Sequence, residues 1–318
     1  MAKKIQKLKP DTILKNYWSN NEQFADLFNA VLFDGKQMIK PDELEEMDTE
    51  ESTILEHREY ADSLQASRDS IKIQKKSSVY GVQLVLFGLE NQEHIHYAMP
   101  MRVMGLDYAA YKKQYENNAK RYKNSDGMDD EEYLSKMKME DKFIPVITIV
   151  VYYGEKPWDG AKTLHEMLKI PPEIAGFVNE YRMLLVEARE NDLALHNINN
   201  VDLFNLLEIL LDKSKPLKET KSKAIEYAKQ HEVEKNVVMT VAGAANCKID
   251  YHALDRKGEV AMYTVFEEIA KESENVGEIR GTIKAYKRMN VPDDIIIENL
   301  QDIYNLSEQE AEEYLRNI

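Results

Sequence analysis

Two apolar strands that end beside carboxylates constrain the fold of this chain more than any other segment. Asp69 opens the run Asp69–Ile73, in which apolar and polar residues alternate as in a half-buried strand. Glu90 closes residues 82–89, a nearly continuous apolar run that suits a strand covered on both faces. The segment between them is polar and ends in glycine, as a connecting turn often does. The sequence therefore predicts a β-hairpin here.

The register of this hairpin would bring two acidic residues together. If the chain turns about Val79 and Tyr80, Asp69 lies opposite Glu90, with their Cβ atoms about 4.5–5.5 Å apart. Strand alternation puts Gln92 on the same face. Two ionised carboxylates this close repel each other, and a hard divalent cation such as Mg²⁺ removes the conflict. The alternative, which spacing alone favours, is a pair of solvated carboxylates at strand ends.

These residues resemble the D…E-x-Q variant of the PD-(D/E)XK nuclease motif. More of the chain resembles one branch of that superfamily, the recombination-promoting nuclease (Rpn)/putative transposase family. The ordered segments that carry this resemblance are Phe24–Phe33, Ser67–Asp69, Gly88–Gln92, His96–Pro100, Pro145–Thr148 and Tyr153–Gly160. The resemblance implies an α/β, restriction-endonuclease-like core, with a central mixed β-sheet flanked by helices. It also implies metal-dependent DNA cleavage in recombination, in a mobile element or in defence against foreign DNA.

The resemblance also implies roles for individual residues. Asp69 and Glu90 would bind Mg²⁺ or Mn²⁺, and the main-chain carbonyl of Asn91 would also reach the metal. Gln92 stands where the superfamily commonly has a lysine. We therefore expect Asp69, Glu90 and Gln92 to be the catalytic residues and DNA to be the partner.

Three further residues are candidates for the same site. Lys72, beside the proposed site, and Arg102, on the next predicted helix, are candidate contacts to DNA phosphates. An ordinary solvated charge is the alternative for Lys72. Glu22 ends Ser19–Glu22, which reads as a capping box. We expect Glu22 to cap a helix, and a role in the site is the weaker alternative.

The net charge of −15 counts against a protein that coats DNA with a large basic surface. It does not exclude a nuclease, because a metal and a local basic patch can serve one phosphate. The second hypothesis is a catalytically silent nuclease-fold module that binds DNA or another protein. The acidic balance and the missing lysine favour this hypothesis, whereas Asp69 and Glu90 oppose it.

Compartment and membrane association are indicated by features that the sequence lacks. The only cysteine, Cys247, excludes an intramolecular disulfide and a cysteine-based zinc cluster. No apolar run approaches the length of a transmembrane helix, and the N-terminus lacks the apolar region of a signal peptide. We therefore expect a cytoplasmic protein without membrane contact, and homo-oligomerisation stays open.

Helical periodicity predicts which faces pack on the sheet. Phe24, Leu27 and Phe28 begin one apolar face of a helix that Gly35 would end. After Pro100, a stripe recurs at three and four residues, and it consists of Met101, Met104, Tyr108, Tyr111 and Tyr115. We expect this stripe to pack on the sheet. The alternative is a set of aromatic groups that stack on DNA bases.

The remaining pattern divides the chain into two regions. Residues 143–153 predict a central strand, Tyr181–Val186 predicts another, and Thr53–Leu55 is a candidate for the first. Strand signals fade beyond residue 200, and Ser214–Pro216 marks a boundary. We expect a nuclease-like core over residues 1–213 and an all-α region over residues 214–318, in which the apolar run 237–246 is ambiguous.

Overall fold

The computed structural model describes residues 10–46, 71–74, 84–92, 95–122, 127–154, 156–190, 192–212, 214–244 and 260–316. Contacts divide this part of the chain into two units. One unit spans residues 10–212 and 231–244, and the other spans residues 214–230 and 260–316. One division falls at residue 213, and residues 231–244 belong to the first unit.

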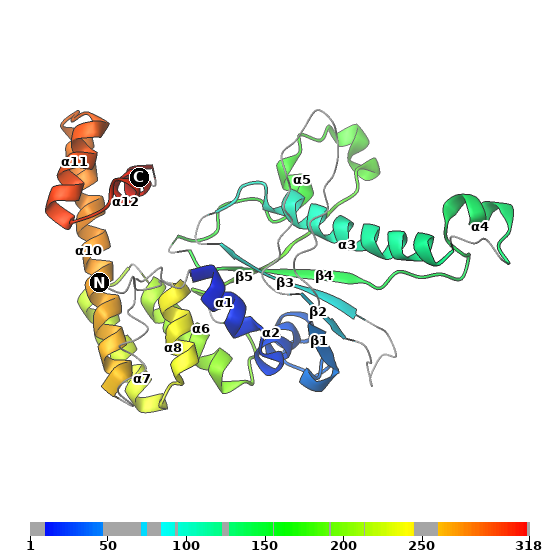
Figure 1. Ribbon diagram of the computed structural model, residues 1–318, viewed down its shortest axis with the longest axis horizontal. Helices are drawn as coiled ribbons and strands as arrows, with labels where there is room; N and C mark the ends of the chain where they lie inside the picture. Colours follow the sequence, from blue (N-terminus) through cyan, green and yellow to red (C-terminus); the bar gives the residue numbers. More distant parts are fainter. Residues whose placement is uncertain are drawn as a thin grey trace, which may run out of the picture. The chain divides into compact units, whose positions relative to one another are not determined.

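A five-stranded mixed sheet forms the centre of the first unit, in the order β1-β2-β3-β4-β5 (Figure 1). Its strands are β1 (Leu44–Glu46), β2 (Ile71–Gln74), β3 (Leu84–Gln92), β4 (Val146–Tyr152) and β5 (Leu184–Glu187). β2 pairs antiparallel with β1 and β3, whereas β4 pairs parallel with β3 and β5. The expected α/β class is therefore confirmed.

Strand β4 is buried over its last five residues. Val150 and Tyr152 pack with α3 (Met99–Arg121), which connects β3 to β4. Ile149 and Val151, which alternate with them, are completely buried as well. The strand is thus covered on both faces, as its continuous apolar sequence predicts. In Figure 1, α3 lies above the sheet, and helices α1 and α2 lie below it.

The first described strand differs from the predicted one. β1 follows a 3₁₀ turn, η1 (Pro41–Glu43), and pairs with β2 at the edge of the sheet. The other candidate for a first strand, Thr53–Leu55, lies outside the described residues.

Four helices form the layer below the sheet: α1 (Pro10–Trp18), α2 (Asn21–Phe33), α6 (Ile198–Leu211) and α8 (Lys235–Ala244). Their core is rich in aromatic side chains, with Trp18, Phe24, Phe28 and Phe204 fully buried. α8 packs on α1 and α6, and a Cβ at Gly243 would be only 3.4 Å from Ile13. The ambiguous run 237–246 is therefore a core helix over its described part.

The ends of α2 differ from the predicted caps. Asn20, not Ser19, is the N-cap, and its side chain accepts hydrogen bonds from the N–H groups of Glu22 and Gln23. The C-cap is Asp34 with φ of 53°, followed by Gly35 with φ of 79°. A Cβ at Gly35 would lie 2.7 Å from the Ala194 carbonyl oxygen, so close packing also favours glycine there.

Helix α3 exposes four of the five residues of the predicted stripe, whereas Tyr111 is partly buried. The expected stripe is largely exposed, at 52% for Met101, 37% for Met104, 55% for Tyr108 and 39% for Tyr115. The buried face consists instead of Met99, Pro100, Val103, Leu106 and Asp107. Both faces carry apolar residues at helical spacing, so periodicity alone could not choose between them.

The remaining elements are helical. The first unit also holds α4 (Asp130–Ser135), α5 (Leu164–Met167) and η2 (Pro172–Phe177). The described helices of the second unit are α7 (Leu217–His231), α10 (Val260–Arg288), α11 (Asp293–Tyr304) and α12 (Glu308–Arg316). Ile283, Ile296, Leu300 and Ala311 form the core of α10, α11 and α12. Within the described ranges, no helix is both long and apolar enough to cross a membrane.

Candidate functional site

Glu90, Asn91 and Gln92 are the last three residues of β3 and stand beside the end of β4. They pair in register with Val150, Val151 and Tyr152, respectively. The register shifts between Phe87 and Glu90, because β3 holds one more residue there than β4 does. Such a bulge bends a strand and re-aims the side chains beyond it, and bulges are frequent beside functional sites. The three residues thus occupy an irregular end of an otherwise regular strand.

Much of the predicted site lies outside the described residues. Asp69 belongs to this group, and so do the side chains of Lys72, Glu90, Asn91 and Gln92. The backbone of Lys72 is described, and it pairs with Leu86 and with Glu46. The proposed proximity of Asp69 and Glu90 therefore stays a prediction.

The hairpin register differs by one residue from the predicted one. Ile71 pairs with Phe87 and Gln74 with Leu84, whereas a turn about Val79 and Tyr80 would pair Ile71 with Gly88. A shift of one residue changes the face on which each side chain of a regular strand lies. The bulge after Phe87 adds a second shift, so simple alternation cannot be carried from β2 to Glu90. No sequence pattern fixes the number of residues in the turn, and that number sets the register of the hairpin.

The two other candidates lie at helix starts. Arg102 follows Met99 by three residues in α3, and it is partly buried. Its backbone N–H donates to the Ala98 carbonyl oxygen, as expected in the first turns of a helix. Glu22 is exposed in the first turn of α2, where a negative charge suits the helix dipole.

A buried carboxylate that the sequence analysis missed holds α3 on the sheet. Asp107 is 7% exposed, and it accepts a hydrogen bond of 2.5 Å from the Thr148 hydroxyl of β4. The Tyr181 hydroxyl, from the segment that precedes β5, donates to the other carboxylate oxygen. One side chain thus ties the crossover helix to two neighbouring strand segments. In the sequence, Asp107 is marked only by being a charged residue among apolar residues on one face of α3.

We expect Asp107→Ala to lower the free energy of unfolding of the first unit by about 3 kcal/mol, because two buried hydroxyls lose their charged acceptor. Urea unfolding followed by circular dichroism measures this loss. Glu116→Gln is the matched control on the same helix, where the exposed pair with Lys112 contributes less than about 1 kcal/mol. Equal unfolding midpoints for the two variants would contradict the assigned role of Asp107.

A second carboxylate stands at the end of β5. Glu187 pairs in register with Tyr152, which itself pairs with Gln92 of β3. The carboxylate accepts the Trp158 backbone N–H at 2.8 Å and lies 3.7 Å from the Lys162 ammonium. Its sequence signal resembles that of Glu90, since both residues follow apolar strand runs. Gly154 lets the chain turn there, because a Cβ would collide with the Tyr152 ring.

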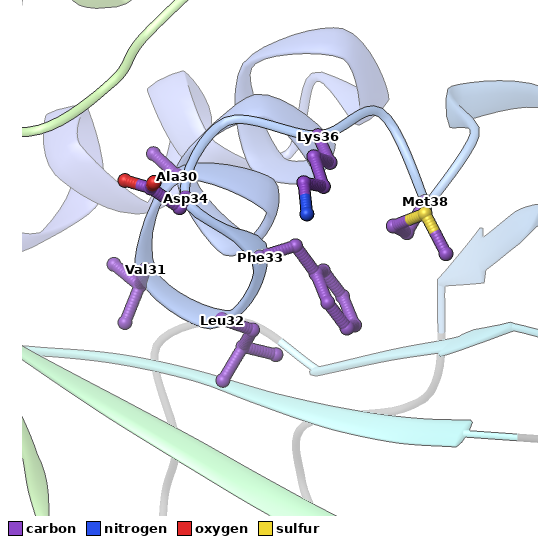
Figure 2. Close-up of a pocket in the computed structure, with 7 residues that line it drawn as sticks. All are labelled: Ala30, Val31, Leu32, Phe33, Asp34, Lys36 and Met38. Atoms are coloured by element: carbon purple, nitrogen blue, oxygen red, sulfur yellow. The ribbon is translucent and has the colours of Figure 1, made fainter.

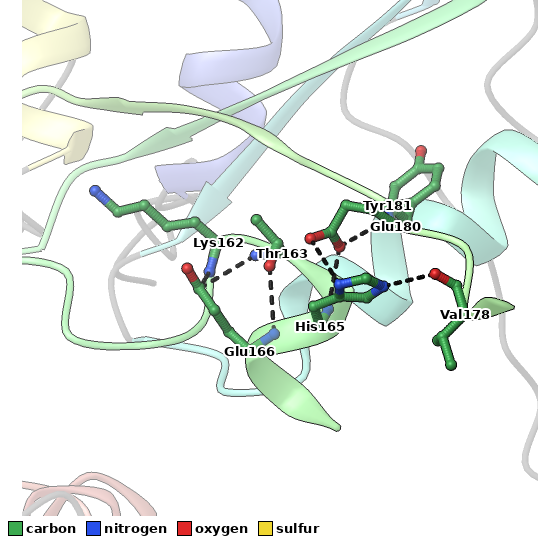
Figure 3. A network of polar contacts seen from close by, with 7 residues as sticks. All are labelled: Lys162, Thr163, His165, Glu166, Val178, Glu180 and Tyr181. Carbon is green, nitrogen blue, oxygen red and sulfur yellow. Dashed lines mark hydrogen bonds and ion pairs between the residues drawn. The ribbon is translucent and has the colours of Figure 1, made fainter. Parts of the chain in front are cut away.

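The loop between β4 and β5 is braced by polar contacts (Figure 3). The His165 ring lies between the Val178 carbonyl oxygen at 2.9 Å and the Glu180 carboxylate at 3.5 Å. Desolvation alone would raise the pKa of Glu180, but the backbone N–H groups of His165 and Tyr181 donate to it and hold that pKa below its usual value. These contacts stabilise the segment that leads to Tyr181.

Below the sheet, a buried polar cluster joins α1, α2 and α6. Asn200 donates to Asp26 at 2.9 Å and to the Gln23 carbonyl oxygen at 2.8 Å, and it accepts from the Tyr17 hydroxyl at 2.9 Å. Burial, together with nearby charged groups such as Asp26, raises the pKa of Tyr17 well above its usual value. Because the buried polar groups of Asp26 and Asn200 are hydrogen-bonded to each other, this cluster stabilises the packing of the helices.

One pocket of about 550 Å³ lies at the end of α2, and Figure 2 shows its lining. The side chains of Phe33, Lys36 and Met38 face the same space, which also borders Val31 and Leu32. Its lining combines apolar side chains with one acidic residue, Asp34, and one basic residue, Lys36, and it contains none of the predicted site residues.

No metal cluster is evident within the described ranges, where no group of three or more His, Cys, Asp or Glu side chains converges. The predicted ligand Asp69 and the Glu90 side chain fall outside those ranges.

In comparisons with known proteins, no family model matches the chain, and no match was found among curated proteins or solved structures.

Proposed function

We propose that the chain is a metal-dependent DNA endonuclease with a restriction-endonuclease-like core. The observation that carries the proposal is the position of Glu90, Asn91 and Gln92. They follow a bulge at the carboxyl end of β3, which pairs in parallel with β4 and antiparallel with β2 in a mixed sheet. In α/β sheets, ligands bind outside the carboxyl ends of parallel strands. The motif from the sequence resemblance thus falls where such a fold supports chemistry.

The chemistry of the donor set fits a hard cation. Asp69 and Glu90 would supply carboxylate oxygens, and Asn91 would supply its main-chain carbonyl oxygen. Mg²⁺ and Mn²⁺ prefer oxygen ligands of this kind. When bound, such an ion supplies an activated water and offsets the charge of a phosphodiester. Lys72 and Arg102 would contribute positive charge toward neighbouring phosphates.

The proposed role is DNA breakage in recombination, in a mobile element or in defence against foreign DNA. It rests on the resemblance to the Rpn/putative transposase family. A catalytically silent module that binds DNA or protein is the second candidate. The net charge of −15 and the presence of Gln92 in place of lysine favour it.

Nicking of supercoiled plasmid separates the two functions. The purified chain is incubated with Mg²⁺, with Mn²⁺ or with EDTA, and open-circular and linear products are measured over time. An endonuclease gives products only with metal. If no metal yields products while calorimetry detects no Mg²⁺ or Mn²⁺ binding, the nuclease proposal is wrong and the silent module stands.

Gln92 is expected to tune cleavage rather than create it. Its amide can position a water, but it lacks the fixed charge of a lysine. We expect Gln92→Ala to slow nicking by about 10²-fold, the scale of one preorganised hydrogen-bond donor. Gln92→Lys introduces an ammonium that the two carboxylates attract, so it would compete with the metal. At saturating Mg²⁺ its rate should at least equal that of Gln92→Ala.

A Mg²⁺ titration of nicking, with wild type and both variants side by side, measures these rates. Equal rates for wild type and Gln92→Ala would remove Gln92 from the site, and only Asp69 and Glu90 would remain to support the proposal.

A further inference from the structure

Trp158 carries a buried hydrogen-bond donor that no described residue satisfies. The residue is 7% exposed, and its indole Nε1 is buried without a hydrogen-bond partner in the part of the chain that the structure describes. Buried donors in folded proteins nearly always have an acceptor, because an unmade bond costs the full desolvation of the group. The other tryptophan follows this rule, since the Trp18 Nε1 donates to the Tyr153 hydroxyl at 3.1 Å. The indole of Trp158 therefore requires an acceptor that the described side chains do not supply.

The indole is fixed by its neighbours, so it cannot turn to find an acceptor elsewhere. Its ring packs edge-on against the Tyr152 ring, with centroids 5.2 Å apart and an interplanar angle of 83°. The Trp158 backbone N–H donates to the Glu187 carboxylate at 2.8 Å. Tyr152 and Glu187 pair in register at the ends of β4 and β5. Two strand ends thus hold Trp158 in place.

The indole nitrogen lies beside the segment that leaves β3. A Cβ built on Gly160 would be 3.2 Å from the indole Nε1 and 3.1 Å from Cγ2 of Ile95, so both atoms border the same small space. Ile95 is the third residue after Gln92, and it packs against the hydrophobic cluster that contains Trp158. The unsatisfied N–H is therefore close to the end of the strand that carries the predicted site.

The strand register places position 92 on the same face of the sheet as Trp158. Gln92 pairs directly with Tyr152, and paired residues of neighbouring strands lie about 4.8 Å apart on one face. This pairing follows the bulge in β3, so the shift at Phe87 does not affect it. Tyr152 and Trp158 belong to the cluster between the sheet and α3. Position 92 is thus next to the residue on which the indole packs.

The side chain at position 92 has the chemistry that the indole needs. A glutamine amide offers an oxygen acceptor at one side and an NH₂ donor at the other, whereas a lysine ammonium has no acceptor. A lysine at this position would leave the Trp158 N–H unsatisfied. The presence of Gln92, where the PD-(D/E)XK superfamily commonly has lysine, therefore has a physical reason in this chain.

We propose that Trp158 is a positioning residue that orients Gln92. The indole N–H donates to the side-chain oxygen of Gln92, which fixes the side to which each end of the amide turns. The NH₂ group then faces away from Trp158, where it can position a water in the candidate site. The inference rests on the proposed nuclease function and deepens it, because it names the residue that preorganises the donor.

NMR of the metal-free, ¹⁵N-labelled chain tests the contact itself. The chain has two tryptophans, so it gives two indole N–H cross-peaks, which Trp158→Phe assigns. We expect Gln92→Ala to shift the Trp158 cross-peak and to accelerate its exchange with D₂O about fivefold to tenfold, the scale of one hydrogen bond. Gln92→Glu keeps an oxygen acceptor and should keep the slow exchange. The Trp18 cross-peak is the internal control and should not change.

An unchanged Trp158 cross-peak in Gln92→Ala would overturn the inference, because the acceptor would then be a water molecule or another group. This measurement needs no variant of Trp158 that folds, since Trp158 itself is intact in the decisive comparison.

Nicking rates separate positioning from general stabilisation. Trp158→Phe should slow nicking about tenfold in the wild-type chain, the scale of one hydrogen bond, but it should cause no further loss in Gln92→Ala, where no amide is left to orient. A purely structural role of Trp158 would slow both proteins equally, and that result would overturn the assignment. Trp18→Phe is the matched control, because it removes another buried indole N–H, and its effect should not depend on residue 92.

The contact and the nuclease activity can fail separately. A Trp158 cross-peak that responds to Gln92→Ala, in a chain that neither nicks DNA nor binds Mg²⁺ or Mn²⁺, would support the contact and overturn the nuclease. Metal-dependent nicking with an unresponsive cross-peak would retain the nuclease and overturn the contact.

Discussion

Asp69→Asn and Glu90→Gln are each expected to abolish Mg²⁺-dependent DNA nicking while the chain stays folded. Both substitutions keep the size of the side chain and remove a negative charge that a hard cation requires. Loss of either carboxylate should lower the rate by at least about 10³-fold, since it removes the metal and not a single hydrogen bond. The plasmid assay at saturating Mg²⁺ measures this loss.

Asp130→Asn is the matched control, because it removes one carboxylate charge at an exposed position of α4. Calorimetry of the same proteins should show Mg²⁺ binding for wild type and this control only. Circular dichroism must be unchanged in all variants. A near-wild-type rate for either Asp69→Asn or Glu90→Gln would show that the site assignment is wrong, whatever the register of the hairpin.

A fragment of residues 1–213 is expected to lose cooperative folding, whereas a fragment of residues 1–245 should retain it. The shorter fragment lacks α8, whose Val237, Val238 and Val241 are at most 1% exposed. Burial of each valine contributes about 1.5–3 kcal/mol, or roughly 5–9 kcal/mol together. This loss is comparable to the whole stability of an ordinary domain, about 5–15 kcal/mol.

Thermal and urea unfolding of the two fragments measure the difference directly. The longer fragment is the control, because both lack residues 246–318 and differ only in the segment that contains α7 and α8. Superimposable cooperative transitions would contradict the assignment of α8 to the core. A folded 1–245 fragment that binds Mg²⁺ would in addition show that residues 246–318 are not needed for metal binding.

Local sequence patterns determined much of the secondary structure. The apolar run around Ile149 predicted a central strand, and β4 lies between β3 and β5 with Ile149, Val150 and Val151 completely buried. Ser307 and Glu310 form a capping box before α12, with the Ser307 N–H donating to the Glu310 carboxylate and the Glu310 N–H donating to the Ser307 hydroxyl. Both signals depend on residues only a few positions apart, so they can be read from the chain directly.

Tertiary contacts decided what these patterns left open. The rotation of α3 depends on Asp107 meeting Thr148 and Tyr181, which are 41 and 74 residues away in sequence. The membership of α8 in the core depends on α1, which lies more than 200 residues earlier. The register before Glu90 depends on a turn and a bulge that shift strand pairing by single residues. A helix with two apolar faces, or a strand with two possible registers, is locally degenerate. Only the partner that packs against it removes the degeneracy, because burial and hydrogen bonding are gained on one face alone.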